Sequence, residues 1–191
     1  LVSGHLGLFM QIGNSEFTKP RKQLILPLFE GTEKAPNNSL TGLSRVQRRL
    51  VKDALDSKEF DGKKGKKMTL WTSGCNIVLV GMGARDSLTH KIARNTGART
   101  ISSLSKKNGV GITVRFTSGW TADRMLDFVE GMMLRDYEFL EHQELPDEHI
   151  NDEWDVDFQA SSRYQKALSE RLLLIQSVTS GVHLARDMGN E

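Results

Sequence analysis

Residues 76–104 read NIVLVGMGARDSLTHKIARNTGARTISSL: a short apolar run, a turn containing two glycines, and a longer stretch with helical spacing. The apolar run is continuous rather than alternating, which is typical of a strand that is buried on both faces. Asp86 or Ser87 is a suitable N-cap for a helix that we expect to extend to about Lys107. A buried strand followed directly by a helix is the unit from which layered α/β domains are built.

The same alternation continues on both sides of this stretch. Apolar runs predict further strands at residues 6–12, 23–29, 68–73, 111–117 and 156–160. Helical spacing predicts helices at residues 44–55 with Ser44 as the N-cap, at 121–140, and from about 164 to 188. Residues 141–157 are acidic and contain a proline, so we expect a surface connection there.

These elements together predict an α/β fold with three layers, α/β/α, around a mixed, mostly parallel sheet of about five or six strands. The runs at residues 76–81 and 111–117 are too continuous for a surface edge, so we expect both to be interior strands. Pro27 lies within the run at residues 23–29 and indicates either an edge strand or the end of that strand.

The composition is that of an ordinary globular protein. Of the 191 residues, 38% are hydrophobic and 26% are charged, and the formal net charge of +2 disfavours a dedicated nucleic-acid-binding protein. The single cysteine, Cys75, cannot form an intrachain disulfide and fits a reducing compartment. No apolar run approaches the roughly 20 residues that cross a bilayer, and no basic segment precedes the first apolar stretch. We therefore expect a cytoplasmic protein without a membrane span.

Two features could bind phosphate. Gly81 and Gly83 follow a buried strand, as in phosphate-cradling turns, but GMGARDS lacks the third glycine of a dinucleotide fingerprint, so a plain strand-to-helix turn is favoured. The second feature is a basic cluster that consists of Lys63, Lys64, Lys66 and Lys67. It could contact phosphate or DNA, but without interleaved aromatic residues it is more typical of a solvated loop.

Histidine, cysteine and tryptophan residues form no recognisable catalytic or metal site. None of the histidines has HExxH spacing; they are His5, His90, His142, His149 and His183. Two of them, His142 and His149, lie in an acidic stretch with Glu144, Asp147 and Glu148. We expect this stretch to be a solvated loop rather than a metal site. Cys75 has no histidine nearby, so we expect packing rather than nucleophilic chemistry. We expect core or interface positions, rather than a ligand cage, for Trp71, Trp120 and Trp154.

Four segments resemble leucine aminopeptidases of the two-metal cytosolic type. GVHLARDMGNE, residues 181–191, resembles the segment that joins the two domains of these enzymes. Residues 76–104 resemble a strand, Gly-x-Gly turn and helix of the N-terminal domain, residues 128–139 a later helix, and residues 23–31 an early central strand. The resemblance covers roughly residues 22–191 and identifies the chain as the N-terminal domain of such an enzyme.

The resemblance implies a division of the chain and of its chemistry. Residues 1–160 would be the N-terminal α/β domain, and residues 161–191 a connecting helix that leads to an absent peptidase domain. That domain would hold two divalent ions, Zn or Mn, on Lys, Asp and Glu ligands in Asp-Ser-Gly-Gly and Asn-Thr-Asp-Ala-Glu-Gly-Arg stretches. Neither stretch occurs here, so we assign no catalytic, cofactor-binding or metal-ligating residue to this chain.

The family also implies partners and a role. The whole enzyme would remove N-terminal residues from peptides, and this chain would serve structure, oligomer assembly and access to the active site. Its partners would be its own C-terminal peptidase domain and the other subunits of a homohexamer. Some bacterial members bind DNA, but the near-neutral charge of this chain disfavours that.

One alternative is a stand-alone binding module. The N-terminal domain of this family is similar to the macrodomain fold, which in other proteins binds ADP-ribose, so the chain could instead recognise a nucleotide or ADP-ribose. Likeness of fold alone does not transfer an activity.

Overall fold

A computed structural model describes residues 11–104, 111–136 and 154–190, and within these ranges the chain forms a six-stranded sheet. The strands are β1 (Gln11–Ser15), β2 (Gln23–Leu28), β3 (Lys67–Leu70), β4 (Asn76–Gly81), β5 (Gly111–Arg115) and β6 (Asp155–Gln159). Their order across the sheet is β1-β6-β5-β2-β4-β3. All neighbouring strands are parallel except β3 and β4, which form an antiparallel pair. The predicted mixed, mostly parallel sheet is confirmed.

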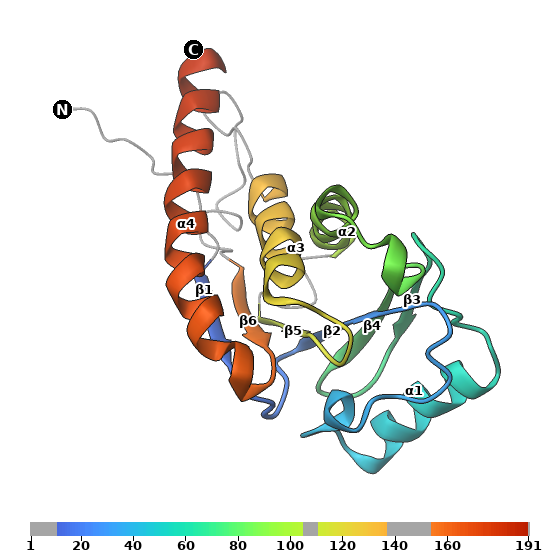
Figure 1. The fold of residues 1–191 in the computed structure, drawn as a ribbon. Helices are drawn as coiled ribbons and strands as arrows, with labels where there is room; N and C mark the ends of the chain where they lie inside the picture. Colours follow the sequence, from blue (N-terminus) through green and yellow to red (C-terminus); the bar gives the residue numbers. More distant parts are fainter. Residues whose placement is uncertain (1–10, 105–110, 137–153, 191) are drawn as a thin grey trace.

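Helices cover both faces of this sheet. They are α1 (Arg45–Asp56), α2 (His90–Ser102), α3 (Ala122–Arg135) and α4 (Ser162–Asn190), with short 3₁₀ helices η1 (Asn37–Leu40) and η2 (Arg85–Ser87). In Figure 1, α1 lies on one side of the strands, and α2, α3 and α4 lie on the other. The three-layer α/β/α architecture is therefore confirmed, and β4 and β5 are interior strands, as expected.

The continuous apolar runs are explained by two separate cores. In β2, Leu24 and Leu26 pack with α1, whereas Ile25, between them, packs with the residues of α3 and α4 on the other face. Because successive side chains of a strand point to opposite faces, a strand between two helical layers has no polar face. β4 follows the same rule.

Pro27 lies in a central strand, so the edge-strand alternative is wrong, whereas its proximity to the end of β2 is as expected. β2 pairs with β5 only through Ile25, but with β4 as far as Leu28. Leu28 accepts a hydrogen bond from Met82, and the backbone groups of alternate residues point to opposite neighbours. Pro27 therefore faces the β5 side, where pairing has already ended, and its missing N–H costs the sheet nothing.

The helix starts are set by side-chain caps. Ser44 forms the expected cap of α1: its hydroxyl accepts from Gln47 N, while the Gln47 side chain accepts from Ser44 N. The prediction that Asp86 or Ser87 caps the next helix is wrong, because both lie in η2. The cap is Thr89, whose hydroxyl accepts from Ile92 N.

Other boundaries also shift. α2 ends at Ser102 rather than near Lys107, with Ser103 as its C-cap. The strand expected at residues 6–12 falls mostly outside the described residues, and β1 extends to Ser15. The acidic connection expected at residues 141–157 also lies outside them as far as residue 153, and residues 155–157 belong to β6 instead.

α4 belongs to the sheet domain over its first half. Leu168 and Leu172 are buried in the same core as α3, and Tyr164 donates a hydrogen bond from its hydroxyl to the carbonyl of Trp120. Beyond this part, α4 continues past the sheet (Figure 1).

Candidate functional site

The backbone N–H groups of the glycine turn at the end of β4 are bonded to protein carbonyls and are not free to bind an anion. Gly81 N donates to Lys66 O at 2.7 Å, Met82 N to Leu28 O at 3.0 Å and Gly83 N to Gly62 O at 2.9 Å. Phosphate-binding turns need free N–H groups that point at the ligand. Here three consecutive N–H groups are already used within the protein, and η2 separates the turn from the start of α2.

The two glycines are required by close contact with a neighbouring loop. A side chain at residue 81 would place its Cβ 2.0 Å from the carbonyl oxygen of Lys63. Gly83 has a positive φ of 77°, and a Cβ there would lie 3.1 Å from Cβ of Lys64. The two glycines, considered from the sequence as a possible phosphate-binding turn, are therefore required for packing against the lysine-rich loop.

That loop, residues 62–67, is held in place by its own contacts. Gly65 N donates to Gly81 O at 3.2 Å, and the ammonium groups of Lys63 and Lys66 lie 3.3 and 3.5 Å from the carboxylate of Asp61. The backbone N–H of Lys63 also donates to Asp61 and, with both ammonium groups, holds the pKa of that carboxyl below its usual value. The lysines thus project from an ordered loop.

Three of these lysines line a surface pocket of about 330 Å³ between the loop and α2. From α2 the pocket receives two cations that the sequence analysis did not single out, Lys91 and Arg99. With Asn95 they are spaced four residues apart, which places them on one face of the helix. The described residues that line it are Lys64, Gly65, Lys66, Lys67, Val80, Lys91, Ile92, Asn95, Thr96, Arg99, Thr100 and Ser103.

A buried arginine is the second feature that the sequence analysis missed. Arg115 is fully buried on the α1 face of β5, and its guanidinium donates to Ser39 O, Thr41 O, Thr18 O and the Gln159 side chain. Burial lowers the pKa of Arg115 to about 10, opposed by the thiol of Cys75 and the carboxylate of Asp157. It therefore remains charged at neutral pH. Because its donors are fully used, it ties loops to the sheet and is not available to a ligand.

The two histidines that the structure describes, His90 and His183, belong to no cluster of metal-ligating side chains among the described residues. Nδ1 of exposed His90 lies 2.6 Å from the carboxylate of Asp127. Burial, together with nearby Arg186, lowers the pKa of His183. The other histidines and the acidic residues that accompany two of them lie outside the described residues, and are His5, His142, His149, Glu144, Asp147 and Glu148.

Cys75 is buried, as expected of a packing residue. Burial raises the pKa of its thiol to about 11, which suppresses the nucleophilic thiolate. Trp120 and Trp154 are core residues, whereas Trp71 is 67% exposed and lies outside the core.

Within the residues that the structure describes, no group of three or more His, Cys, Asp or Glu side chains is placed to hold a metal ion. No helix in the same ranges is long and apolar enough to cross a membrane.

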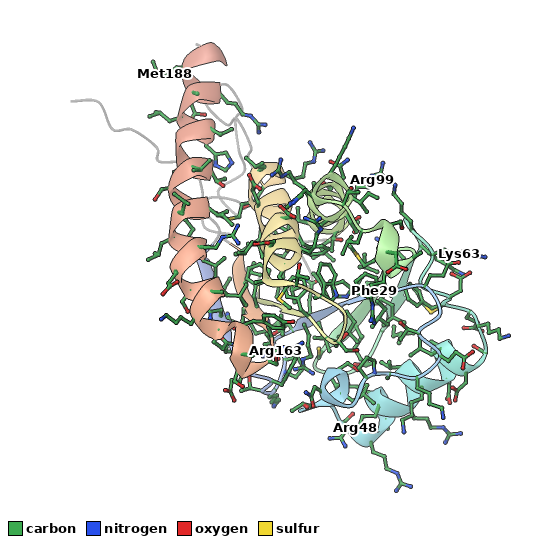
Figure 2. All side chains as sticks on the ribbon, in the orientation of Figure 1. Phe29, Arg48, Lys63, Arg99, Arg163 and Met188 are labelled. Carbon is green, nitrogen blue, oxygen red and sulfur yellow. The ribbon has the colours of Figure 1, made fainter. Side chains whose placement is uncertain are left out.

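The outer side of α4 carries a series of exposed apolar side chains. Leu173, Leu174, Val178, Leu184 and Met188 are between 52% and 69% exposed. At 100° per residue, these five side chains fall within one sector of the helix, together with Ser177, Gly181 and Ala185. Arg186 and Asp187 point away from that sector. Figure 2 shows Met188 near the C-terminal end of α4, away from the sheet.

The chain is similar to a known protein family and to several solved structures. The model of the N-terminal domain of the cytosol aminopeptidase family matches residues 25–144. A mutant of tomato leucine aminopeptidase shares the fold, with a TM-score of 0.68 and 17% identity over 97% of this chain and 39% of that one.

The bottromycin maturation enzyme BotP is also similar. Its structure matches with a TM-score of 0.56 and 19% identity over 87% of this chain and 32% of that one; its complex with Mn matches with a TM-score of 0.52 and 18% identity, covering 87% and 31%. The chain thus spans about two fifths or less of these solved structures. No curated protein sequence matches it.

Proposed function

Because the chain belongs to the cytosol aminopeptidase family and matches its N-terminal domain, we propose that it is the non-catalytic N-terminal domain of a metal-dependent leucyl aminopeptidase. The whole enzyme removes N-terminal residues from peptides. In it, this domain contributes structure, subunit assembly and control of access to the active site, and a peptidase domain supplies the chemistry.

The exposed apolar sector of α4 is the observation that carries this proposal. Between Leu173 and Met188 the sector contains only apolar and small side chains, over about four helical turns. A surface helix normally places charges on its solvent side, and a long apolar stripe there marks a contact surface. The first half of α4 is held in the core, so the domain presents this stripe on a rigid support.

We assign the peptidase domain of the same polypeptide as the partner. The tomato enzyme is matched over 97% of this chain but over only 39% of its own length, so the larger part of such an enzyme has no counterpart here. The resemblance to two-metal aminopeptidases implies that the peptidase domain would bind two divalent ions, Zn or Mn. The complete enzyme would be a cytoplasmic homohexamer, with residues 161–191 as the connecting helix, which is held in this domain's core over its first half and leads to the peptidase domain.

The alternative, a stand-alone nucleotide or ADP-ribose module, has less support. Its natural site is the glycine turn, and the N–H groups of residues 81–83 are already bonded to protein carbonyls. Binding there would require breaking the contacts that hold the lysine loop.

A matched pair of substitutions in the protein made from the complete gene tests the proposal. Val178 and Val46 are both exposed helical valines, on α4 and α1 respectively, at 52% and 67%. Val178→Glu should place a charge in the domain contact and reduce hydrolysis of a leucine anilide substrate or shift the assembly to smaller particles. Val46→Glu should change neither.

Two results would count against this proposal. One is full activity and unchanged assembly of the Val178→Glu protein. The other is metal-dependent turnover by residues 1–191 alone with added Mn or Zn, because the chain would then contain a catalytic centre.

A further inference from the structure

The pocket between the lysine loop and α2 is lined by charges of one sign. Its cations are Lys64, Lys66, Lys67, Lys91 and Arg99, and no carboxylate is among the described residues that line it. A concave surface of one sign focuses the field and concentrates counter-ions. From this geometry we propose that the pocket binds a compact phosphorylated metabolite through its phosphate groups.

Within the described ranges, four of the five pocket cations have no carboxylate within ion-pair distance. Elsewhere on α2 and α3, Arg94 lies 2.7 Å from Glu130 and Arg124 lies 3.2 Å from Asp127. Among the described residues, only Lys66 of the pocket cations has a carboxylate within ion-pair distance, at 3.5 Å from Asp61. The positive charge on the pocket side of α2 therefore remains available to an anion.

Both walls of the pocket are fixed in position. The lysine loop is bonded to the glycine turn through Gly65 N, Gly81 N and Gly83 N. The opposite wall is α2, which packs against α3 so closely that a Cβ on Gly97 would lie 2.0 Å from the carbonyl oxygen of Phe128. Figure 2 shows Arg99 on α2 and Lys63, which belongs to the lysine loop, on the same side of the molecule.

The chemistry of the walls selects the class of ligand. Arg99 offers the planar guanidinium fork that matches phosphate oxygens, and the lysines offer point charges. Thr96 and Thr100 donate their hydroxyl protons to helix carbonyls at 2.8 and 2.7 Å, so their oxygens can only accept.

Among the described lining residues there is no aromatic side chain on which a base could stack. A volume of about 330 Å³ is small for a ligand site. The pocket therefore fits a compact ligand that is recognised through its phosphate groups rather than through a nucleobase.

Pyrophosphate is the probe that tests this site. Titration into the ¹⁵N-labelled chain should give saturable amide shifts at Gly65, Asn95 and Thr96. A Lys91→Gln, Arg99→Gln double variant should weaken binding by about tenfold or more, because it removes the fork and one point charge. Both residues are exposed, so the thermal midpoint of this variant should stay close to that of the parent.

The control removes the same charge from the opposite helical layer. Arg45 and Lys52 are exposed on α1, and an Arg45→Gln, Lys52→Gln variant should change the pyrophosphate affinity by less than about twofold if charge is sensed locally. ADP should bind no more tightly than pyrophosphate.

Four results would overturn the assignment. Three of them are no saturable shift, equal weakening in both double variants, and a clear preference for ADP. The first two would show that the pocket has no specific site and attracts anions only through diffuse surface charge. The third would show recognition of a base, which these walls do not explain. Tighter, saturable binding of a DNA duplex with no response to pyrophosphate would also contradict it.

Discussion

Oε1 of Gln159 accepts two hydrogen bonds from Arg115, one from Nε at 2.9 Å and one from Nη2 at 2.6 Å. Nε2 of the same amide donates to Thr18 and Asp157 at 3.0 and 2.9 Å. The pair therefore joins β5 and β6 to the segment after β1.

Replacing this arginine should be among the most destabilising single changes in the domain. Arg115→Leu leaves the carbonyls of Thr18, Ser39 and Thr41 without their donor, and we expect a loss of about 3–5 kcal/mol in the free energy of unfolding. Arg115→Lys keeps the charge but has fewer donors. Its free energy of unfolding should therefore lie between those of the parent and of Arg115→Leu. Urea unfolding measures both; a loss below about 1 kcal/mol for the leucine variant would show that the network is dispensable.

Cys75 should make the domain less stable at alkaline pH. Its pKa is raised from 9.0 to about 11 by burial, opposed by Arg115. A group whose folded pKa is raised contributes full stability below its unfolded pKa and loses it as pH rises through the folded value. The free energy of unfolding should therefore fall between about pH 9 and 11.

The Cys75→Ala variant supplies the comparison, because it lacks the titrating thiol. Its stability should decline less steeply over the same pH interval. Native Cys75 should also react slowly with iodoacetamide at pH 8 and quickly in urea. Equal pH slopes for the two proteins, or fast labelling of the native thiol, would mean that the site is more open than its burial indicates.

Two glycine-to-alanine substitutions should act in opposite directions. Gly81→Ala forces a methyl group to within 2.0 Å of a backbone oxygen and should cost about 2–3 kcal/mol. Gly181 lies in α4 with nothing within 4 Å of its missing Cβ, so Gly181→Ala should add roughly 0.5–1 kcal/mol through helix propensity. Thermal unfolding compares them, and a tolerated Gly81→Ala would contradict the close contact with the lysine loop.

Removing the residues after Ser180 should cost little stability. The last ten or so residues of α4 contribute no member to either core, although Arg186 donates to the carbonyl of Leu134 at 3.2 Å. We expect the thermal midpoint to fall by less than about 8 °C, which corresponds to roughly 2 kcal/mol for a domain of this size. A larger fall would place this segment within the domain's own core.

The fold was predictable because burial on both faces leaves a direct mark on the sequence. The run from Asn76 to Val80 has no polar side-chain alternation, and this alone indicates an interior strand. The Ser44 N-cap was also predictable, because its partner Gln47 lies only three residues away along the chain. Cap assignment failed at Thr89 because Asp86, Ser87 and Thr89 are all capable caps, and only the inserted 3₁₀ turn decides among them.

The pocket and the arginine network were not predictable for a different reason. Lys64 and Arg99, or Arg115 and Thr18, are far apart along the chain, and no local pattern links them. Only the sheet order brings them together. From the sequence alone, the single arginine in GITVRFT is equally consistent with the end of a strand and with a buried residue that binds loops to the sheet.

The register that pairs Gln11 with Asp155 has a consequence for biosynthesis. β1 leaves the ribosome early, yet its only neighbour among the described strands is β6, which is translated near the end of the domain. At ordinary elongation rates the first strand waits roughly 7–30 s for its partner. During that interval β2, β4 and β5 can already assemble with α1, α2 and α3, so the nascent chain closes its last strand pair after most of the domain has folded. Chaperones that protect unpaired strands would find their target at residues 11–15, in the interval before residues 155–159 emerge.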